Sequence, residues 1–174
     1  MTFLRHSAIA ILLIPATVLA EEHSSQRIGL VAGPTYGVGL SYGRQNDSTG
    51  IGWQVSGFPL WLEEERFLSG GFTLSKTLHK GGGEGALQLF LSGGLAAYYS
   101  SYDNSDSFWN DDRDIDESLT LVFGPGVGLR LRMAPFDFSA GLPVAVFLRN
   151  EESEDRVRYE IIPYIPNLAC FYRW

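Results

Sequence analysis

The stretch LTLVFGPGVGLRLR (residues 119–132) alternates between two kinds of side chain over most of its length. One face carries large apolar residues: Leu119, Leu121, Phe123, Val127, Leu129 and Leu131. The other face carries small or charged ones, namely Gly124, Gly126, Gly128, Arg130 and Arg132. A period of two residues is typical of a β-strand. An ordinary globular strand has about 5 or 6 residues, so this one is unusually long.

The same alternation recurs through the rest of the chain. It is clearest in ALQLFLSGGLAAYY (86–99) and FDFSAGLPVAVFLR (136–149), and shorter versions are YGVGLSYG (36–43), IGWQVSG (51–57) and GFTLSKTLH (71–79). A soluble sandwich also alternates, but here the apolar face is nearly uninterrupted on long strands and the glycines lie opposite it. A narrow barrel explains this arrangement, because its apolar side chains meet lipid while small and polar ones fill the lumen. Backbone groups in a bilayer must all be paired, so such strands have to close.

Composition narrows the class of protein further. The formal net charge of −7 argues against a nucleic-acid partner, since phosphate binding needs a basic patch. One cysteine, Cys170, excludes an intrachain disulfide. The length of 174 residues suits one domain.

Residues 1–20 are predicted to be a cleaved signal peptide. Arg5 precedes the short apolar stretch SAIAILLIPATVLA (7–20), in which Val18 and Ala20 fit the small positions before a signal-peptidase cut. A transmembrane helix needs about 20 apolar residues, so secretion is the better interpretation. Residues 21–174 are then the exported domain.

We predict an all-β fold: an eight-stranded antiparallel up-and-down transmembrane β-barrel. Short connections at 44–50, 79–85 and 133–135 are expected on the periplasmic side, and those at 59–66, 100–117 and 150–155 outside. An even count requires a strand at 26–33, whereas one bent strand over 27–43 would leave seven. Pro163 and Pro166 interrupt the last strand, which predicts either a bulge or a first half that stands above the membrane.

The sequence finishes with LACFYRW (168–174), in which Cys170 and Tyr172 stand at every second place before the last residue, Trp174. This ending resembles the C-terminal β-signal of Gram-negative outer-membrane proteins, with Trp174 where that family usually has Phe. Together with the strand pattern, it is similar to small barrels of the OmpA, OmpX and PagL kind. The resemblance implies a location in the bacterial outer membrane. It also implies contact with outer-membrane lipid and lipopolysaccharide, and recognition of the last strand by the outer-membrane assembly machinery.

Four charged residues are predicted to face the lumen near the periplasmic end: Arg130, Arg132, Asp137 and Arg173. A buried charge needs a partner, so we expect Asp137 to pair with one of the arginines. An eight-stranded lumen is about filled by its own side chains, which argues against a general diffusion pore.

The acidic segment 100–117 is a candidate surface contact, through Phe108, Trp109, Asp111 and Asp112. Carboxylates suit calcium or magnesium, but NDDRDIDE (110–117) lacks the order of an EF-hand. A solvated loop is the simpler interpretation, and we expect neither a metal nor a cofactor.

These observations favour a structural or surface-interaction role. One alternative is a lipid-modifying enzyme like the lipid A deacylases, but these have a His two residues before the catalytic Ser. This chain has no such pair near His79, and no catalytic residue is assigned. The other alternative is a soluble periplasmic ligand-binding barrel, which predicts that the apolar faces point inward.

Overall fold

The computed structural model describes residues 24–62, 65–81, 85–103, 115–151, 156–163 and 165–174. Its strands are β1 (Ser24–Gly33), β2 (Gly37–Asn46), β3 (Ile51–Trp61), β4 (Glu65–Lys80), β5 (Leu87–Asp103), β6 (Ile115–Met133), β7 (Phe136–Pro143), β8 (Ala145–Glu151), β9 (Arg156–Ile162) and β10 (Asn167–Arg173). Among these residues, no helix is long and apolar enough to cross a membrane.

The ten segments make a closed barrel of eight antiparallel strands. β7 and β8 are two parts of one strand beside β6, separated only at Val144, and β9 and β10 are two parts of the last strand. Each strand pairs with its neighbour in the sequence, and β10 pairs with β1 to close the wall. The predicted fold is confirmed. The seven-strand alternative is wrong, because β1 and β2 form a hairpin that turns at residues 34–36.

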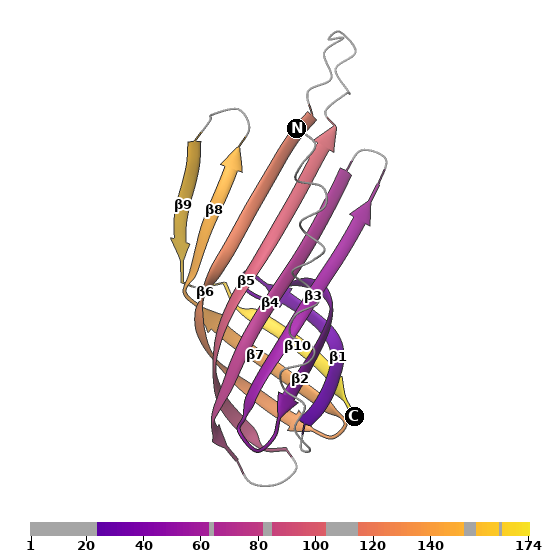
Figure 1. Cartoon of the computed structure of the whole chain (residues 1–174), viewed down its shortest axis with the longest axis vertical. Coiled ribbons are helices and arrows are strands. Elements are labelled where there is room, and N and C mark those ends of the chain that lie inside the picture. Colours follow the sequence, from indigo (N-terminus) through magenta and orange to yellow (C-terminus); the bar gives the residue numbers. More distant parts are fainter. Residues whose placement is uncertain (1–23, 63–64, 82–84, 104–114, 152–155, 164) are drawn as a thin grey trace.

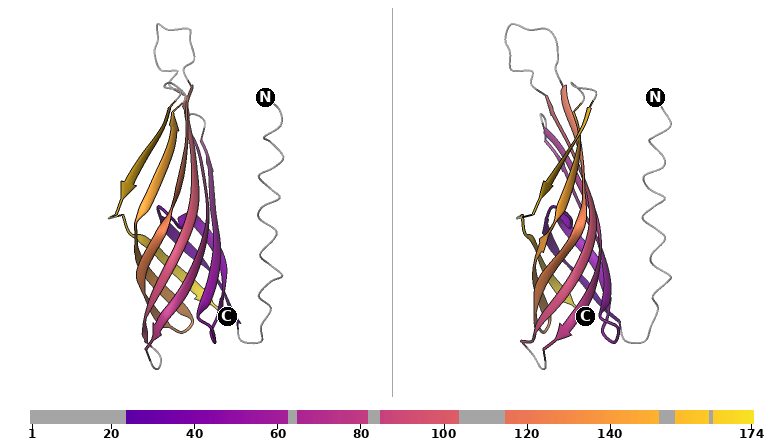
Figure 2. Two further views of the ribbon diagram at one scale, coloured as in Figure 1. Left: turned by 60° about the vertical axis from the view of Figure 1, so that its left-hand side comes forward. Right: turned by 90° about the vertical axis from the view of Figure 1, so that its left-hand side faces the viewer.

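The wall is complete over only part of its height. β1, β2 and β10 stay in the lower half of the molecule, while β3, β4, β5, β6, β8 and β9 continue beyond them (Figures 1 and 2). We call the lower part the closed barrel and the upper part the upper sheet, whose order is β3-β4-β5-β6-β8-β9. The end of the closed barrel that carries residues 47–50 and 134–135 is called the turn end.

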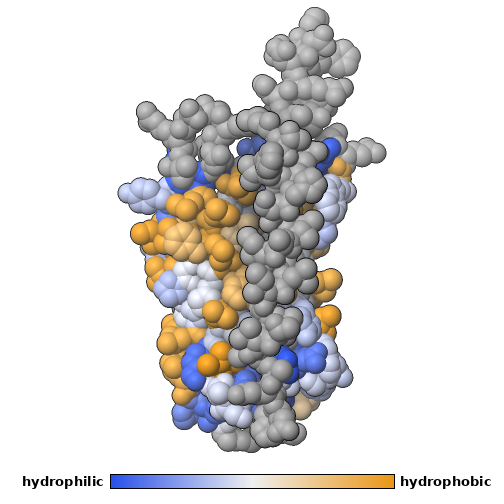
Figure 3. All heavy atoms as spheres, viewed as in Figure 1, coloured by the Kyte–Doolittle hydropathy of each residue, from blue (hydrophilic) through white to orange (hydrophobic). Residues whose placement is uncertain are grey.

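Large apolar side chains point outward from the wall. Leu30, Leu40 and Leu129 are 61%, 65% and 48% exposed, whereas the inward-facing Phe90 and Val122 are fully buried. On the side shown in Figure 3, hydrophobic residues gather over the middle of the molecule and hydrophilic ones toward its two ends. The soluble alternative predicted apolar faces pointing inward, and the structure has the opposite arrangement.

Two of the predicted connections are shorter than the sequence indicates, and the irregularity in the last strand is of one of the two expected kinds. Strands continue to Trp61 and restart at Glu65, so the expected 59–66 loop is much shorter. The 100–117 segment likewise loses its two ends to β5 and β6. The irregularity around residues 163–166 separates β9, which pairs only with β8, from β10, which pairs with β7 and β1. It is therefore a break between two levels of the molecule and not a bulge within one ladder.

Candidate functional site

The tip of the β1–β2 hairpin lies inside the barrel. Thr35 and Tyr36 are 1% and 3% exposed. The backbone N–H of Thr35 donates to Asn167 Oδ1 at 3.2 Å, and Asn167 Nδ2 donates to Thr35 Oγ1 at 2.7 Å. From the facing wall, Thr73 Oγ1 donates to the Thr35 carbonyl at 3.3 Å. The tip thus joins β10 to β4 across the lumen and seals it at mid-height.

Glycines make room for this tip. Gly37 has a φ of 76°, a left-handed backbone conformation that side chains other than glycine rarely adopt. A Cβ atom at Gly94 would lie 2.4 Å from the Thr35 carbonyl oxygen, and one at Gly71 would lie 2.3 Å from that of Tyr36. The small face of β4 and β5 is therefore the surface against which the hairpin tip packs.

Polar side chains fill the lumen below the tip. Arg27 is 2% exposed and donates to Gln45 Oε1 at 3.5 Å and to Gln54 Oε1 at 3.4 Å. Gln45 Nε2 continues the network to Thr77 Oγ1 at 3.1 Å. The guanidinium carbon of Arg27 lies 4.6 Å from the ring centroid of Phe171, a cation–π distance. These polar side chains and the Phe171 ring therefore fill the centre of the barrel.

The four charged residues predicted to face the lumen lie together at the turn end. Arg130 is 3% exposed, donates to Gln45, and places its guanidinium carbon 5.1 Å from the centroid of Phe90. Asp137 is 1% exposed, with Arg132 Nε at 3.6 Å and Arg173 Nε at 3.9 Å from its Oδ1. Arg132 also forms a 2.8 Å ion pair with Asp47.

Sequence reasoning missed several members of this network. Arg27, Gln45 and Gln54 were not singled out, although each occupies the small or polar face of its strand. The hairpin tip was also missed, because the sequence places Thr35 in a turn and a turn is expected at a barrel rim. The position of these polar residues on the lumen-facing side of the alternation could have identified them. Nothing in the sequence pattern indicates that the hairpin tip bends inward.

A plugged lumen predicts a protein that does not conduct. Purified protein reconstituted in a planar bilayer should give no steady single-channel current, because the hairpin tip and the Arg27 network lie across the only axial path through the described wall. A general porin in the same bilayer serves as the positive control. Stable ohmic steps that scale with the amount of protein would contradict the sealed lumen.

Above the hairpin tip lies a cavity of about 520 Å³, which we call the upper cavity. Its lining is Gly33, Pro34, Val38, Tyr98, Thr120, Phe147, Arg149, Arg158, Tyr159, Glu160 and Ile165. The hairpin supplies the floor, and the inner face of the upper sheet supplies the wall. Pockets for small molecules usually measure about 300–1,000 Å³ and combine apolar walls with a few polar groups, as this one does.

An aromatic row continues the wall of the cavity toward β3. The ring centroids of Phe58 and Phe67 are 6.5 Å apart, and those of Phe67 and Tyr98 are 6.4 Å apart. Tyr98 also fixes the floor, because its hydroxyl donates to the Gly33 carbonyl at 2.6 Å and contacts the Pro34 carbonyl at 3.1 Å. Floor and wall are therefore held in one arrangement.

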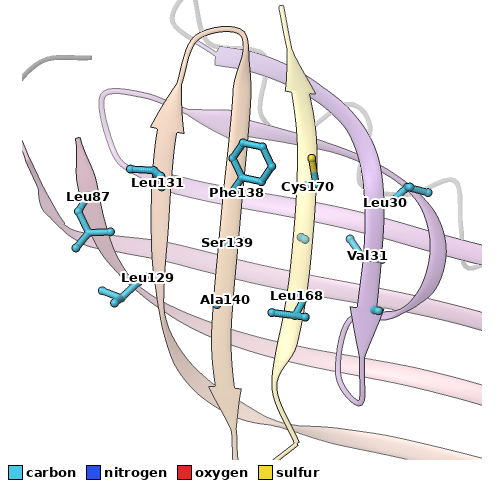
Figure 4. Close-up of a pocket in the computed structure, with 12 residues that line it drawn as sticks. Leu30, Val31, Leu87, Leu129, Leu131, Phe138, Ser139, Ala140, Leu168 and Cys170 are labelled. Carbon is cyan, nitrogen blue, oxygen red and sulfur yellow. The ribbon is translucent and has the colours of Figure 1, made fainter. Parts of the chain in front are cut away.

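A second hollow, of about 590 Å³, lies on the outer wall across β1, β10, β7 and β6 (Figure 4). Leu30, Leu129, Phe138 and Leu168 are exposed around the small residue Ala140. Its lining is almost entirely apolar, with Ser139 the one hydroxyl in it. It is a shallow groove in the outward-facing apolar surface, and its only hydroxyl and thiol are those of Ser139 and Cys170.

Cys170, Tyr172 and Trp174, the predicted assembly signal, lie along the outward face of the last strand. Cys170 is partly buried in the outer groove, and Tyr172 stacks on Trp174 with centroids 6.1 Å apart. The backbone of Trp174 exchanges two hydrogen bonds with Gln26, at 3.1 and 3.2 Å. Their recognition by assembly machinery stays a prediction.

The remaining candidates offer no reactive cluster in the part of the chain that the structure describes. Phe108, Trp109, Asp111 and Asp112 lie outside the described residues. His79 is exposed near the end of β4, whereas Thr77 faces the lumen. Among the described residues, no group of three or more His, Cys, Asp or Glu side chains could hold a metal ion.

No family model and no curated protein matches the chain. Two solved structures are similar to it, each with 14% identity, a TM-score of 0.45 and 87% of this chain covered. One is the N-terminal β-barrel domain of OprF from Pseudomonas aeruginosa, of which 98% is covered. The other is a major outer membrane protein from Thermus thermophilus, of which 99% is covered.

Proposed function

We propose that this protein spans the bacterial outer membrane as a sealed barrel and has a structural or surface-interaction role there. The observation that carries the proposal is a continuous outward-facing apolar band around a lumen filled by polar side chains. This arrangement is the reverse of a soluble domain and is typical of a transmembrane barrel. Lipid is then the immediate partner of the outer wall, and the upper sheet is the part that can meet other molecules.

The height of the band supports this location. On β5 the outward positions run from Leu87 through Leu91 and Leu95 to Tyr99, with Leu87, Leu91 and Leu95 all about half exposed. At about 3.3 Å per residue and a tilt of ~40°, this stretch rises roughly 30 Å. The hydrocarbon core of a bilayer is about 30 Å thick. The apolar band therefore matches a membrane without a gap or an excess.

Arginine substitutions along β6 test the proposal. Val127 lies near the middle of the outward face of β6 and Met133 at its turn end, and they are 46% and 44% exposed. Val127→Arg is expected to lower the free energy of unfolding by about 2–4 kcal/mol in lipid, because the charge enters the bilayer midplane. Met133→Arg should cost only about 0–1 kcal/mol, since its charge reaches the interface.

The measurement is urea unfolding of protein folded into lipid vesicles, followed by the difference in gel mobility between unboiled and boiled samples. Equal effects of Val127→Arg and Met133→Arg would contradict the proposed membrane location. So would recovery of the protein in a soluble fraction without detergent, because a soluble barrel places both residues in water.

A further inference from the structure

We propose that the upper cavity binds a single-chain amphiphile with an anionic headgroup, which enters sideways from the membrane between β3 and β9. The inference rests on the proposed membrane location and adds a ligand class to it. It depends on three features of the described residues: an opening in the wall, the apolar surroundings of that opening, and the charges in the cavity lining.

The opening follows from the pairing of the strands. Above the hairpin, residues Phe58–Trp61 of β3 pair only with β4, and β9 pairs only with β8. No described strand joins β3 to β9 at this level. β1 ends at Gly33 and β10 begins at Asn167, so both lie below it. The wall that is closed below the hairpin tip is thus open on one side above it.

This opening lies within the apolar band. The hairpin tip is level with Gly94 of β5, whose Cβ position meets Thr35. The outward face of β5 continues from there to Leu95 and Tyr99, a further rise of roughly 12 Å. On the neighbouring strand, Leu121 and Leu119 are also exposed at this height. Hydrocarbon is therefore expected to surround the wall at the level of the opening.

Both sides of the opening carry outward-facing apolar groups. Trp61 on β3 is 68% exposed, and Tyr159 and Ile161 on β9 are 78% and 59% exposed. Inside, Phe147, Tyr98 and Val38 line the cavity close to the hairpin floor. An apolar chain that passes between the two edges thus meets apolar groups at the opening and again beside the hairpin floor.

The charges of the cavity select the headgroup. Arg149 and Arg158 are direct cross-strand partners on β8 and β9 and line the same cavity, together with a single carboxylate, Glu160. The two arginines outnumber the one carboxylate of this lining, in a chain whose net charge is −7. Each guanidinium group carries five N–H donors, so these arginines can hold an anion in addition to the interactions they already make. A phosphate or carboxylate headgroup therefore suits this lining.

A bound headgroup also answers a problem that the open wall creates. Backbone groups at a sheet edge have no water to bond with inside hydrocarbon, and each unsatisfied group is costly there. The edges of β3 and β9 face the opening without a strand between them. An anionic headgroup in the opening can accept hydrogen bonds from the N–H groups of these edges, which a plain hydrocarbon chain cannot.

The test is calorimetric titration of dodecyl phosphate into the full-length mature protein in phospholipid nanodiscs, with empty nanodiscs as the blank. Saturable binding of one molecule per protein is expected. Dodecanol and ethyl phosphate, which lack the anion and the chain respectively, should each bind at least about tenfold more weakly. The shift in gel mobility on boiling is measured on the same preparations, so failure to form a membrane barrel is distinguishable from failure to bind.

Variants assign the binding to the upper cavity. Arg149→Gln with Arg158→Gln should weaken binding at least about tenfold, since charge-assisted hydrogen bonds are lost, and Thr120→Phe should abolish it by filling the space. Glu160→Gln should tighten binding, because it removes the one carboxylate of the lining. Binding that is unchanged or weaker in this variant would contradict the proposal even if the other variants fail to fold. Arg66→Gln is the matched control, because Arg66 is exposed on β4 and does not line the cavity.

Several results would overturn the inference. One is a titration heat no different from that of empty nanodiscs. Another is that dodecanol or ethyl phosphate binds as tightly as dodecyl phosphate. A third is that Arg66→Gln weakens binding as much as the double arginine variant does. Extraction of lipid from purified wild-type protein and the double variant then identifies the source of the ligand. Enrichment of an anionic lipid in the wild type alone indicates a resident membrane lipid. Dodecyl phosphate binding without such enrichment indicates a free amphiphile of the same chemistry.

Discussion

Gly94→Ala is expected to lower the free energy of unfolding by about 2–3 kcal/mol, a large effect for the addition of one methyl group. The new Cβ would lie 2.4 Å from the Thr35 carbonyl oxygen and 3.0 Å from the Thr35 Cβ. Neither contact can be relieved by a side-chain rotation, so the hairpin tip or β5 has to move. Such a movement also strains the Thr73 and Asn167 hydrogen bonds that hold the tip. Urea unfolding in lipid vesicles, followed by tryptophan fluorescence, measures the loss.

The adjacent glycine provides the control. Gly93 lies on the outward face of the same strand, and a Cβ there would meet nothing within 4 Å. Gly93→Ala should be neutral or stabilise the barrel by up to about 1 kcal/mol, because alanine loses less conformational entropy on folding than glycine. If both alanines had the same effect, the hairpin tip would not occupy the lumen beside β5.

Asp137→Asn is the second change with a large expected effect, a loss of about 3 kcal/mol or more. Asp137 is buried at the turn end, where Arg132 and Arg173 approach its carboxylate and Arg27 and Arg130 are also buried. The amide keeps the shape of the side chain and removes the negative charge. The arginines are then left in the lumen without it, and an uncompensated buried charge is costly.

Asp47→Asn is the matched comparison. Asp47 forms a shorter ion pair with Arg132, at 2.8 Å, but its side chain is 39% exposed. Solvent screens such a pair, so the expected loss is below about 1 kcal/mol and should shrink further at high salt. The Asp137→Asn loss should change little with salt. A larger loss of unfolding free energy for Asp47→Asn than for Asp137→Asn would show that the exposed ion pair, and not the buried carboxylate, stabilises the network.

The alternation of side chains was sufficient to predict the barrel. A residue at every second position must share a face in a strand, so Leu119 to Leu131 had to lie together opposite the glycines and arginines. The length of these strands and the short turns between them then indicated an antiparallel wall. The placement of Arg132, Asp137 and Arg173 in one part of the lumen follows from the same periodicity. Asp137 and Arg132 are direct cross-strand partners, which the turn at 133–135 implies.

Only the tertiary structure decided how far the wall closes and what seals it. Strand pairing depends on register between distant segments, and the short reach of β1, β2 and β10 leaves β3 and β9 as edges above the hairpin. The inward bend of Thr35 depends on acceptors and donors at Thr73 and Asn167, which lie far from it in the sequence. Periodicity states which face of a strand a residue occupies. It carries no information about which residue of another strand lies opposite, and both the plug and the upper cavity are made of such long-range contacts.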